Sequence, residues 1–322
     1  MHRKMAKKGK SKSLSIPQEN RINIAKQRIK AAIIAADANN KLNVALEQFK
    51  FVLEEAIKTA GDKGKESVIR SQEPIKLFHE VVKSELIRNG VAPDLIVPQL
   101  GVSAGELNIY GFMKDKSQDI SVLNRNAVKT PEIITAGMTK GRNDILGKDY
   151  TEKTFVVNVR SQMSSIAKNV DTIFERTFAE TLNLHMRCPR MVLGEFFILP
   201  VTGYDMAKVI KKNPKFEDIK AQVATGNLKS TAKVLEEFIY AFASVNNRNQ
   251  ALSEDFKYER VCLLIADFTK TPIKVYNTNA ELIADNLLPN NTTASMNGLA
   301  FPNFIADLLA VYTTRFGAGS FN

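Results

Sequence analysis

The sequence predicts an α/β protein with a mixed central sheet, an αβββαβ core flanked by helices, and a helical extension at the N-terminus. Two observations predict this class. Segments with apolar residues at helical spacing alternate with short apolar segments of strand length. Among the latter, residues 261–266 are uninterrupted apolar, which is typical of a strand buried on both faces of a sheet. The 322 residues are enough for one large domain or two ordinary ones.

The N-terminal part is predicted to be a basic tail followed by helices. Residues 1–16 contain six Lys and Arg residues and no acid, so we expect a disordered tail that either contacts a nucleic-acid backbone or only increases solubility. Residues 17–70 form an N-terminal helical region. Apolar spacing predicts two helices over residues 17–58 with a break near 37–40, and a polar loop over 60–67. We interpret this region as a packing or dimerisation element.

Residues 71–202 are predicted to form the core and residues 203–322 a C-terminal α/β part packed on it. A meander of three strands, a crossover helix and a fourth strand give a mixed sheet with helices on its faces. The expected core elements are a helix ending at Gly90, a loop at 91–104, strands at 106–112 and 119–123 around a charged turn at 114–118, an irregular segment at 124–153, a strand at 154–160, a helix at about 162–186 and a strand at 191–200. The expected C-terminal elements are helices at 229–245, 279–287 and 303–312 and strands at 261–266 and 273–276.

Cysteine and histidine are too scarce for several classes of protein. Two cysteines cannot build a disulfide framework, and three histidines without a CxxC pair exclude zinc fingers and HExxH metalloproteases. A Ser–His–Asp triad is unsupported for the same reason, and no Gly-rich phosphate loop has the required spacing. No apolar run approaches the roughly 20 residues that cross a bilayer, so we expect no membrane partner and a cytoplasmic location.

The charge of the chain favours a polyanionic partner. The net charge is +11 and the isoelectric point is near 9.5, which is typical of proteins that bind nucleic acid. Two basic segments of the body, residues 124–153 and 203–215, are candidates for contacts with DNA bases. Arginine would bind guanine there, and asparagine or glutamine would bind adenine.

One end of the predicted sheet gathers polar residues that suit phosphodiester hydrolysis. Asp119 opens the second core strand, and the third strand places Asn158 and Arg160 on one face. Gln162 follows where that strand turns into the helix. A carboxylate can hold a divalent metal that lowers the pKa of a bound water, while a cation stabilises the charge that develops on phosphorus. Histidine is not required for this chemistry.

The layout resembles the PD-(D/E)XK nuclease core and, among its members, the type II restriction endonucleases. The stretches GFMKDKSQDISVL, TFVVNVRSQMSSIAKN and YERVCLLIADF are similar to blocks of that family, and the αβββαβ order covers residues 75–200. The resemblance implies a Mg²⁺-dependent, sequence-specific endonuclease acting on double-stranded DNA. It also implies a homodimer, because a palindromic site is bound by a two-fold symmetric protein.

The sequence departs from the family at its second half-motif, which is acidic–X–Lys in the family and Asn158-Val159-Arg160 here. Arginine supplies positive charge but stays protonated, and the asparagine oxygen is a weaker ligand than a carboxylate. Some relatives move the second carboxylate to the following helix, which implies Glu175 in that role, with Asp171 as the next choice. The predicted catalytic residues are Asp119, Arg160, Gln162, Lys168 and Glu175, and the predicted metal ligands are Asp119, Glu106 and Glu175.

Two other functions remain open. The chain is alternatively a non-catalytic DNA-binding protein with a degenerate nuclease core, or a structural or assembly protein that binds nucleic acid electrostatically through its tail. The site residues also have structural interpretations. Asp119 can serve as a hydrogen-bonded residue at a strand end, and the spacing of Lys168, Asp171 and Glu175 is that of a solvated helix face with intrahelical ion pairs.

Overall fold

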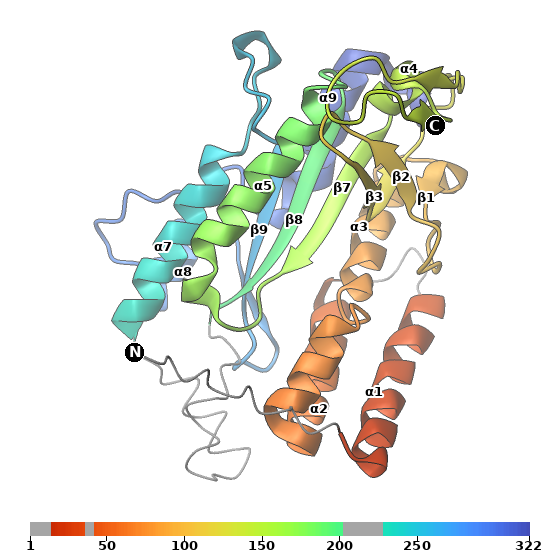
Figure 1. Cartoon of the computed structure of the whole chain (residues 1–322). Coiled ribbons are helices and arrows are strands. Elements are labelled where there is room, and N and C mark those ends of the chain that lie inside the picture. Colours follow the sequence, from red (N-terminus) through yellow and green to blue (C-terminus); the bar gives the residue numbers. More distant parts are fainter. Residues whose placement is uncertain (1–13, 36–41, 202–227) are drawn as a thin grey trace, which may run out of the picture.

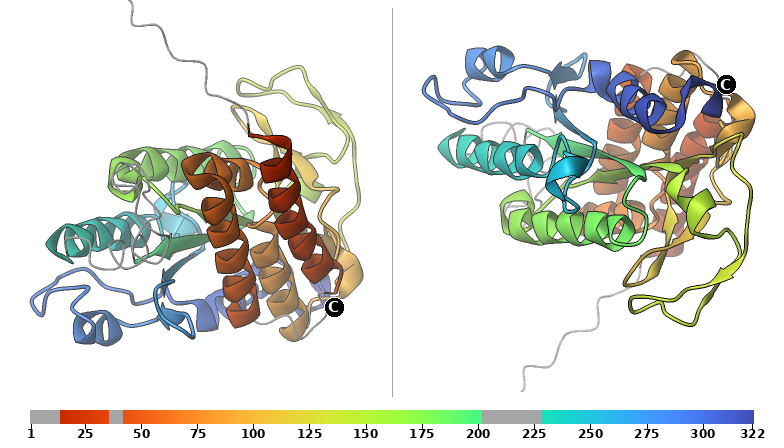
Figure 2. Two further views of the ribbon diagram at one scale, coloured as in Figure 1. Left: turned by 90° about the horizontal axis from the view of Figure 1, so that it is seen from below. Right: turned by 90° about the horizontal axis from the view of Figure 1, so that it is seen from above.

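A six-stranded mixed sheet separates two layers of helices (Figures 1 and 2). The computed structural model describes residues 14–35, 42–201 and 228–322. The strand order is β1-β4-β7-β8-β9-β10, and the strands are β1 (Ile96–Val97), β4 (Ile120–Val122), β7 (Phe155–Ser161), β8 (Val192–Pro200), β9 (Arg260–Asp267) and β10 (Lys274–Tyr276). The pairs β7–β8 and β8–β9 are parallel and the others are antiparallel. The predicted fold class is confirmed.

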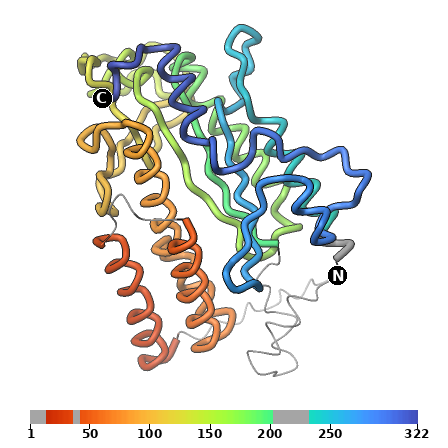
Figure 3. Tube along the Cα trace, turned by 180° about the vertical axis from the view of Figure 1, so that it is seen from behind, coloured from red at the N-terminus to blue at the C-terminus, as the bar shows by residue number. Residues whose placement is uncertain are grey.

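The central strand β8 is buried along all nine of its residues because both faces of the sheet are covered. On one face, Val157 and Phe196 pack in a core with helices α1 (Ile16–Ile34), α2 (Leu42–Arg70), α3 (Lys76–Arg88) and α9 (Phe304–Phe316). On the other face, Val156 and Phe197 pack with α5 (Val170–His185) and α7 (Leu228–Ser244). Seen from behind, α9 and the segments next to it cross the sheet (Figure 3).

The N-terminal helical region differs from the prediction at residues 60–67. The expected polar loop is part of α2, which continues to Arg70 with a kink at Ala60 and Gly61. Gly61 has a positive φ of 57°, a conformation that glycine adopts without a steric penalty. Residues beyond the kink still bury apolar surface, and Val68 is fully buried, so packing keeps the chain helical where its polarity alone indicates a loop.

The expected strand at 106–112 forms outside the main sheet. β2 (Leu107–Tyr110) pairs with β3 (Asp115–Gln118) in a separate hairpin, so the predicted charged turn at 114–118 is itself a strand. The edge position in the main sheet belongs to β1, within the expected loop at 91–104. Asn183 of α5 fixes the hairpin turn, because its Oδ1 accepts hydrogen bonds from Met113 N at 2.7 Å and Lys114 N at 3.1 Å.

The remaining elements follow the predicted order with adjusted ends. The long helix expected from about residue 162 begins later, at the start of α5. Ser165 has a positive φ of 52°, which is not helical, and a short 3₁₀ turn, Ile166–Lys168, separates it from α5. The irregular segment at 124–153 contains β5 (Glu132–Ile133), β6 (Asn143–Asp144) and α4 (Lys148–Glu152). The C-terminal helices include α8 (Asn279–Ala284).

Three predicted features lie outside the described residues. They are the basic tail up to residue 13, the break at 37–40 and the basic region at 203–215. Among the helices that the structure describes, none has the length and apolarity required to cross a membrane.

Candidate functional site

The strand register places three polar residues in one row across the sheet. Ile120 pairs with Val157 in the antiparallel pair of β4 and β7, so Asp119 lies opposite Asn158. Asn158 pairs in turn with Glu195 of β8. Adjacent strands are about 4.8 Å apart, so the row spans roughly 10 Å. The sequence therefore brings together two carboxylates and an amide from strands that lie far apart along the chain.

Asp119 lies at the junction of β3 and β4, where the ladder between β4 and β7 ends. It is half-buried, and its Oδ2 accepts a hydrogen bond of 2.8 Å from the backbone N–H of Val159. Its charge acts on groups from several elements. It contributes to raising the pKa of Glu106, whose largest cause is burial, and it opposes the effect of burial on His79. Glu106 therefore lies near Asp119, as the sequence predicts.

Arg160 of β7 connects this row to helix α5. Its guanidinium forms ion pairs with Glu180 of α5 and, over 3.4 Å, with Oε1 of Glu195. Burial alone would lower the pKa of Arg160, but Glu195, Tyr258 and Asp119 raise it above its ordinary value. The guanidinium is therefore permanently charged, and it is held between acids from two elements.

Asp119, Asn158 and Glu195, together with Arg160 and Glu180, form a polar cluster. Glu195 is its most unusual acid. Its side chain is 0% exposed in the middle of an apolar strand. Burial raises its pKa to about 7, Arg160 opposes that rise, and Asp119 adds to it. Neither carboxyl oxygen of Glu195 receives a hydrogen bond of regular geometry from the described residues, but the buried Tyr258 hydroxyl lies close enough to act as a donor and to lower the pKa of Glu195. A buried acid with this environment is typical of functional sites, where carboxylates are kept available for a ligand or a proton.

Other buried polar groups on β3, β4 and β7 also lack partners among the described residues. Within the described ranges, the side-chain oxygens Asn158 Oδ1 and Gln118 Oε1 have no hydrogen-bond partner, and the same holds for the Ser121 hydroxyl. Burying such groups without partners costs about 1–3 kcal/mol each. Glu180 satisfies part of the cluster, because it accepts a hydrogen bond of 3.2 Å from Asn158 Nδ2 and pairs with Lys116. The Glu195 carboxyl and Asn158 Oδ1 thus lack regular hydrogen bonds from the described residues, while Arg160 and Lys116 supply positive charge to the cluster.

The other predicted residues do not join the row. Gln162 is half-buried at the end of β7, where its Nε2 donates to the carbonyl of Ser164. Lys168 is exposed at the end of the 3₁₀ turn. Glu175 is also exposed, so the structure does not support its predicted role as the displaced carboxylate. The helix places Glu180 on the sheet side instead. Glu175 lies five positions earlier, which rotates it away from Glu180 by about 140° around the helix.

Sequence reasoning missed Glu180 and Glu195. Glu195 had a signal, because it is the one charged residue in the apolar stretch 191–200, and a lone carboxylate in a buried strand needs a partner or a function. Glu180 had none, because it stands among other charged residues of α5 and only the crossing of helix and sheet selects it. Glu80 of α3, which from its place on the helix before Asp119 is a further candidate ligand, has a structural role, since it pairs with Lys83 at 2.7 Å.

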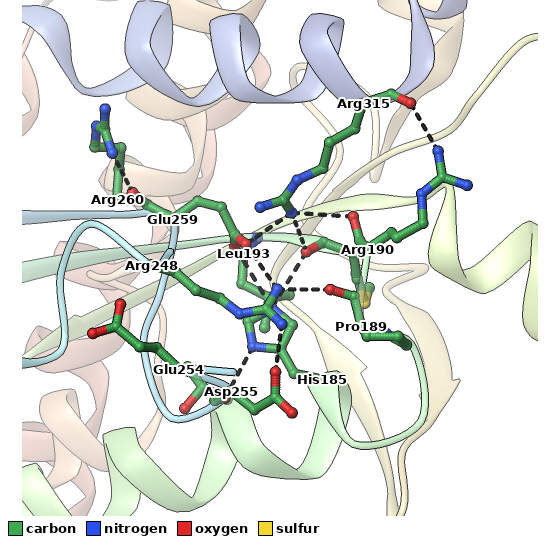
Figure 4. Close-up of polar contacts among 12 residues, drawn as sticks. His185, Pro189, Arg190, Leu193, Arg248, Glu254, Asp255, Glu259, Arg260 and Arg315 are labelled. Carbon is green, nitrogen blue, oxygen red and sulfur yellow. Dashed lines mark hydrogen bonds and ion pairs between the residues drawn. The ribbon is translucent and has the colours of Figure 1, made fainter. Parts of the chain in front are cut away.

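A second buried charge cluster lies around Glu259, which directly precedes β9 (Figure 4). Glu259 receives hydrogen bonds from Arg248 at 3.1 Å and from Leu193 N at 2.7 Å, and it pairs with Arg315 at 2.8 Å. Burial alone would raise the pKa of Glu259, but His185, Arg315 and the Leu193 N–H lower it to about 2. Because this acid is fully compensated, we interpret the cluster as a structural connection between β8, α9 and the segment before β9.

The oxygen atoms of the first cluster offer some of the ligands that a hard divalent cation requires. Within residues 14–35, 42–201 and 228–322, no group of three or more His, Cys, Asp or Glu is arranged to hold a metal ion. Asp119, Glu195 and the Asn158 amide supply two carboxylates and a neutral oxygen. Mg²⁺ commonly uses only one or two carboxylates together with waters and substrate phosphates, so these oxygens suit it.

Comparisons with known proteins add no relative. No protein-family model matches the chain, and neither the curated proteins nor the solved structures contain a significant match.

Proposed function

We propose that this protein is a Mg²⁺-dependent endonuclease that hydrolyses phosphodiester bonds in double-stranded DNA at specific sequences. The observation that carries the proposal is the row of Asp119, Asn158 and Glu195, with Arg160 beside it. A mixed sheet in which an aspartate faces a short polar motif on the next strand supports the resemblance to the PD-(D/E)XK core. The carboxylate lost from that motif is replaced by Glu195, on the neighbouring parallel strand.

Each residue has a chemical role in this proposal. Asp119 and Glu195 would hold the cation, and the Asn158 oxygen would complete the protein ligands. When bound, Mg²⁺ polarises the phosphoryl oxygen and lowers the pKa of a bound water. Arg160 supplies fixed positive charge for the developing phosphorane, and Glu180 keeps the guanidinium oriented.

The nature of the substrate follows from charge. A net charge of +11 favours a nucleic acid over a neutral or cationic partner, and the long-range attraction accelerates encounter with DNA. A homodimer would match a palindromic site. The location we propose is the cytoplasm, as the sequence predicts.

A direct test uses long duplex DNA, purified protein and either Mg²⁺ or EDTA. We expect discrete fragments with Mg²⁺, intact DNA with EDTA, and intact DNA with the Asp119→Ala variant under both conditions. The variant should still retard duplex DNA in a gel, because the substitution removes a metal ligand and leaves the basic surface unchanged. Intact DNA with the wild-type protein across several duplex sequences would contradict the proposal.

The pH dependence of cleavage gives a second prediction. Glu195 is neutral below its pKa of about 7 and charged above it, and only the charged form binds a cation well. We therefore expect kcat/KM to rise roughly tenfold between pH 6 and pH 8, as expected for one deprotonation near pH 7. The measurement is the initial cleavage rate at Mg²⁺ and DNA concentrations below saturation, where the proton and the metal compete for Glu195. A flat profile over this interval would show that Glu195 does not titrate in the reaction.

One observation favours a second candidate, a DNA-binding protein without nuclease activity. Arg160 pairs with both Glu180 and Glu195, so the cluster has a compensating cation of its own. In that case the wild-type protein retards duplex DNA and leaves it intact with Mg²⁺. The cleavage assay above separates the two candidates.

A further inference from the structure

A small arm, residues 125–148, projects from the body next to the β2–β3 hairpin (Figure 2, yellow-green). It consists of the two-stranded sheet β5–β6 and its flanking loops. The chain folds back on itself through backbone hydrogen bonds, including Ile134 N to the Arg142 carbonyl at 2.9 Å and Gly141 N to the Ile134 carbonyl at 2.8 Å. The arm therefore has a defined shape despite its small size.

Buried polar contacts fix the base of the arm to the body. Arg187, which follows α5, donates to Asp144 at 2.6 Å, to Glu132 at 2.9 Å and to the carbonyl of Tyr110 at 2.8 Å. Asp144 is 1% exposed, so this ion pair is shielded from solvent. Breaking it would leave a buried charge, and the arm therefore has a rigid base.

The turn of the arm is fixed as firmly as its base. Thr139 donates from its hydroxyl to the Gly111 carbonyl at 2.8 Å, and Met138 donates from its backbone N–H to the Phe112 carbonyl at 2.8 Å. Gly137 has a φ of 77°, and a Cβ there would lie 2.4 Å from the Phe112 oxygen. Only glycine permits this close approach. The body thus presents the Met138 side chain in a preset position.

The arm exposes an unusual amount of apolar surface for a rigid element. Its exposed apolar side chains are Val128 (72%), Ile133 (59%), Met138 (79%) and Ile145 (68%). These four exposed apolar side chains within 24 positions are available to contact a partner. Because the backbone is fixed, little conformational entropy is lost when this surface is covered.

The charges of the arm indicate what covers it. Its exposed basic residues are Arg125, Lys129, Lys140, Arg142 and Lys148. Its two acids, Glu132 and Asp144, share Arg187, which offsets one of their two charges. The basic residues of the arm still outnumber its acids by five to two. Protein interfaces are depleted in lysine, whereas nucleic-acid interfaces are strongly positive. Apolar side chains set among basic ones are the combination with which proteins enter a DNA groove and part its bases.

We infer that the arm binds in a groove of duplex DNA, with Met138 as an apolar contact to the bases and Lys140 and Arg142 on flanking phosphates. This inference rests on the proposed function for the choice of substrate. Strand β3 connects the two regions, from the hairpin turn that holds the arm to Asp119. Its four residues span roughly 13 Å, about four base-pair steps. One duplex can therefore contact the arm and the half-buried Asp119 end of the cluster together.

The test measures binding of the full-length protein to a fluorescent 30-base-pair duplex by anisotropy, in EDTA and over a series of salt concentrations. For Lys140→Ala/Arg142→Ala we expect about 30-fold weaker binding at 100 mM salt. The slope of log K against log salt should fall by about 2, because each phosphate contact contributes roughly 0.9. For Met138→Ser we expect about tenfold weaker binding with an unchanged slope.

The matched control is Arg70→Ala/Lys233→Ala, which removes two exposed positive charges from α2 and α7. A loss of affinity and slope as large in this control would overturn the inference, because only total charge would then matter. Unchanged DNA binding in both arm variants would also overturn it, and a shift of those variants from dimer to monomer would identify the arm as a protein interface.

Because binding is measured in EDTA, arm-dependent binding without any cleavage in Mg²⁺ would reject only the nuclease proposal. Cleavage with no dependence on the arm would reject only this inference.

Discussion

Replacing Glu195 by glutamine is expected to reduce Mg²⁺-dependent DNA cleavage by about 10³-fold, because a metal ligand contributes several kcal/mol to stabilising the transition state. The variant should remain folded. Glutamine has the shape of glutamate, and burial already disfavours the charged form of Glu195. Arg160 would keep its ion pair with Glu180. The measurement is the cleavage rate under single-turnover conditions, together with a thermal melt to establish folding.

The matched variant is Glu175→Gln on α5. Glu175 is exposed and lies on the side of the helix away from the cluster, so cleavage should be unchanged. The sequence alone predicts the reverse order of effects, with Glu175 as the displaced carboxylate. If Glu175→Gln abolishes cleavage and Glu195→Gln does not, the assignment of Glu195 as a ligand is wrong.

The largest expected effect on stability is that of Glu259→Gln. The substitution removes the negative charge that pairs with Arg248 and Arg315, at a site where the side chain of residue 259 is 0% exposed. Removing one partner of a buried ion pair costs about 3–5 kcal/mol, which corresponds to a fall in Tm of roughly 5 °C for a chain of this size. The exposed pair of Glu66 and Arg70 on α2 provides the control, and Glu66→Gln should leave Tm unchanged.

The same group predicts how acid affects stability. The pKa of Glu259 is about 2 in the folded state and lies below its value in the unfolded chain. Its contribution is therefore complete above pH 4.5 and is lost as the pH falls toward 2. Urea unfolding at pH 7 and pH 3 should show a smaller loss on acidification in Glu259→Gln than in the wild type. An equal loss in both proteins would assign the acid sensitivity to other carboxylates.

The regular elements of the fold could be predicted because their apolar patterns are local. Strand β9 is a continuous apolar run, and α7 repeats apolar residues at helical spacing, so each is recognisable without its neighbours. The hairpin β2–β3 could not be placed in the same way. Asn183 holds its turn from about 70 residues away, and no local pattern shows that contact.

The candidate site was predicted in part for the same reason. Asp119 and Arg160 stand at strand ends, where the period of two already indicates their face of the sheet. Glu180 joins them only because α5 crosses the sheet with that side inward. Glu195 joins them only because β8 lies beside β7 in a parallel register that brings it opposite Asn158. Both facts depend on how the elements pack against each other, and the local patterns of a single sequence do not reveal that packing.

The most direct test of the proposed site is the binding of Mn²⁺, a spectroscopic substitute for Mg²⁺, in the presence of a short uncleavable duplex. Electron paramagnetic resonance should detect a site in the wild-type protein whose affinity falls at least 100-fold in both Asp119→Asn and Glu195→Gln, and not in Glu175→Gln. Binding that is equal in all four proteins, or absent from the wild type, would contradict the claim that these strands form a metal site.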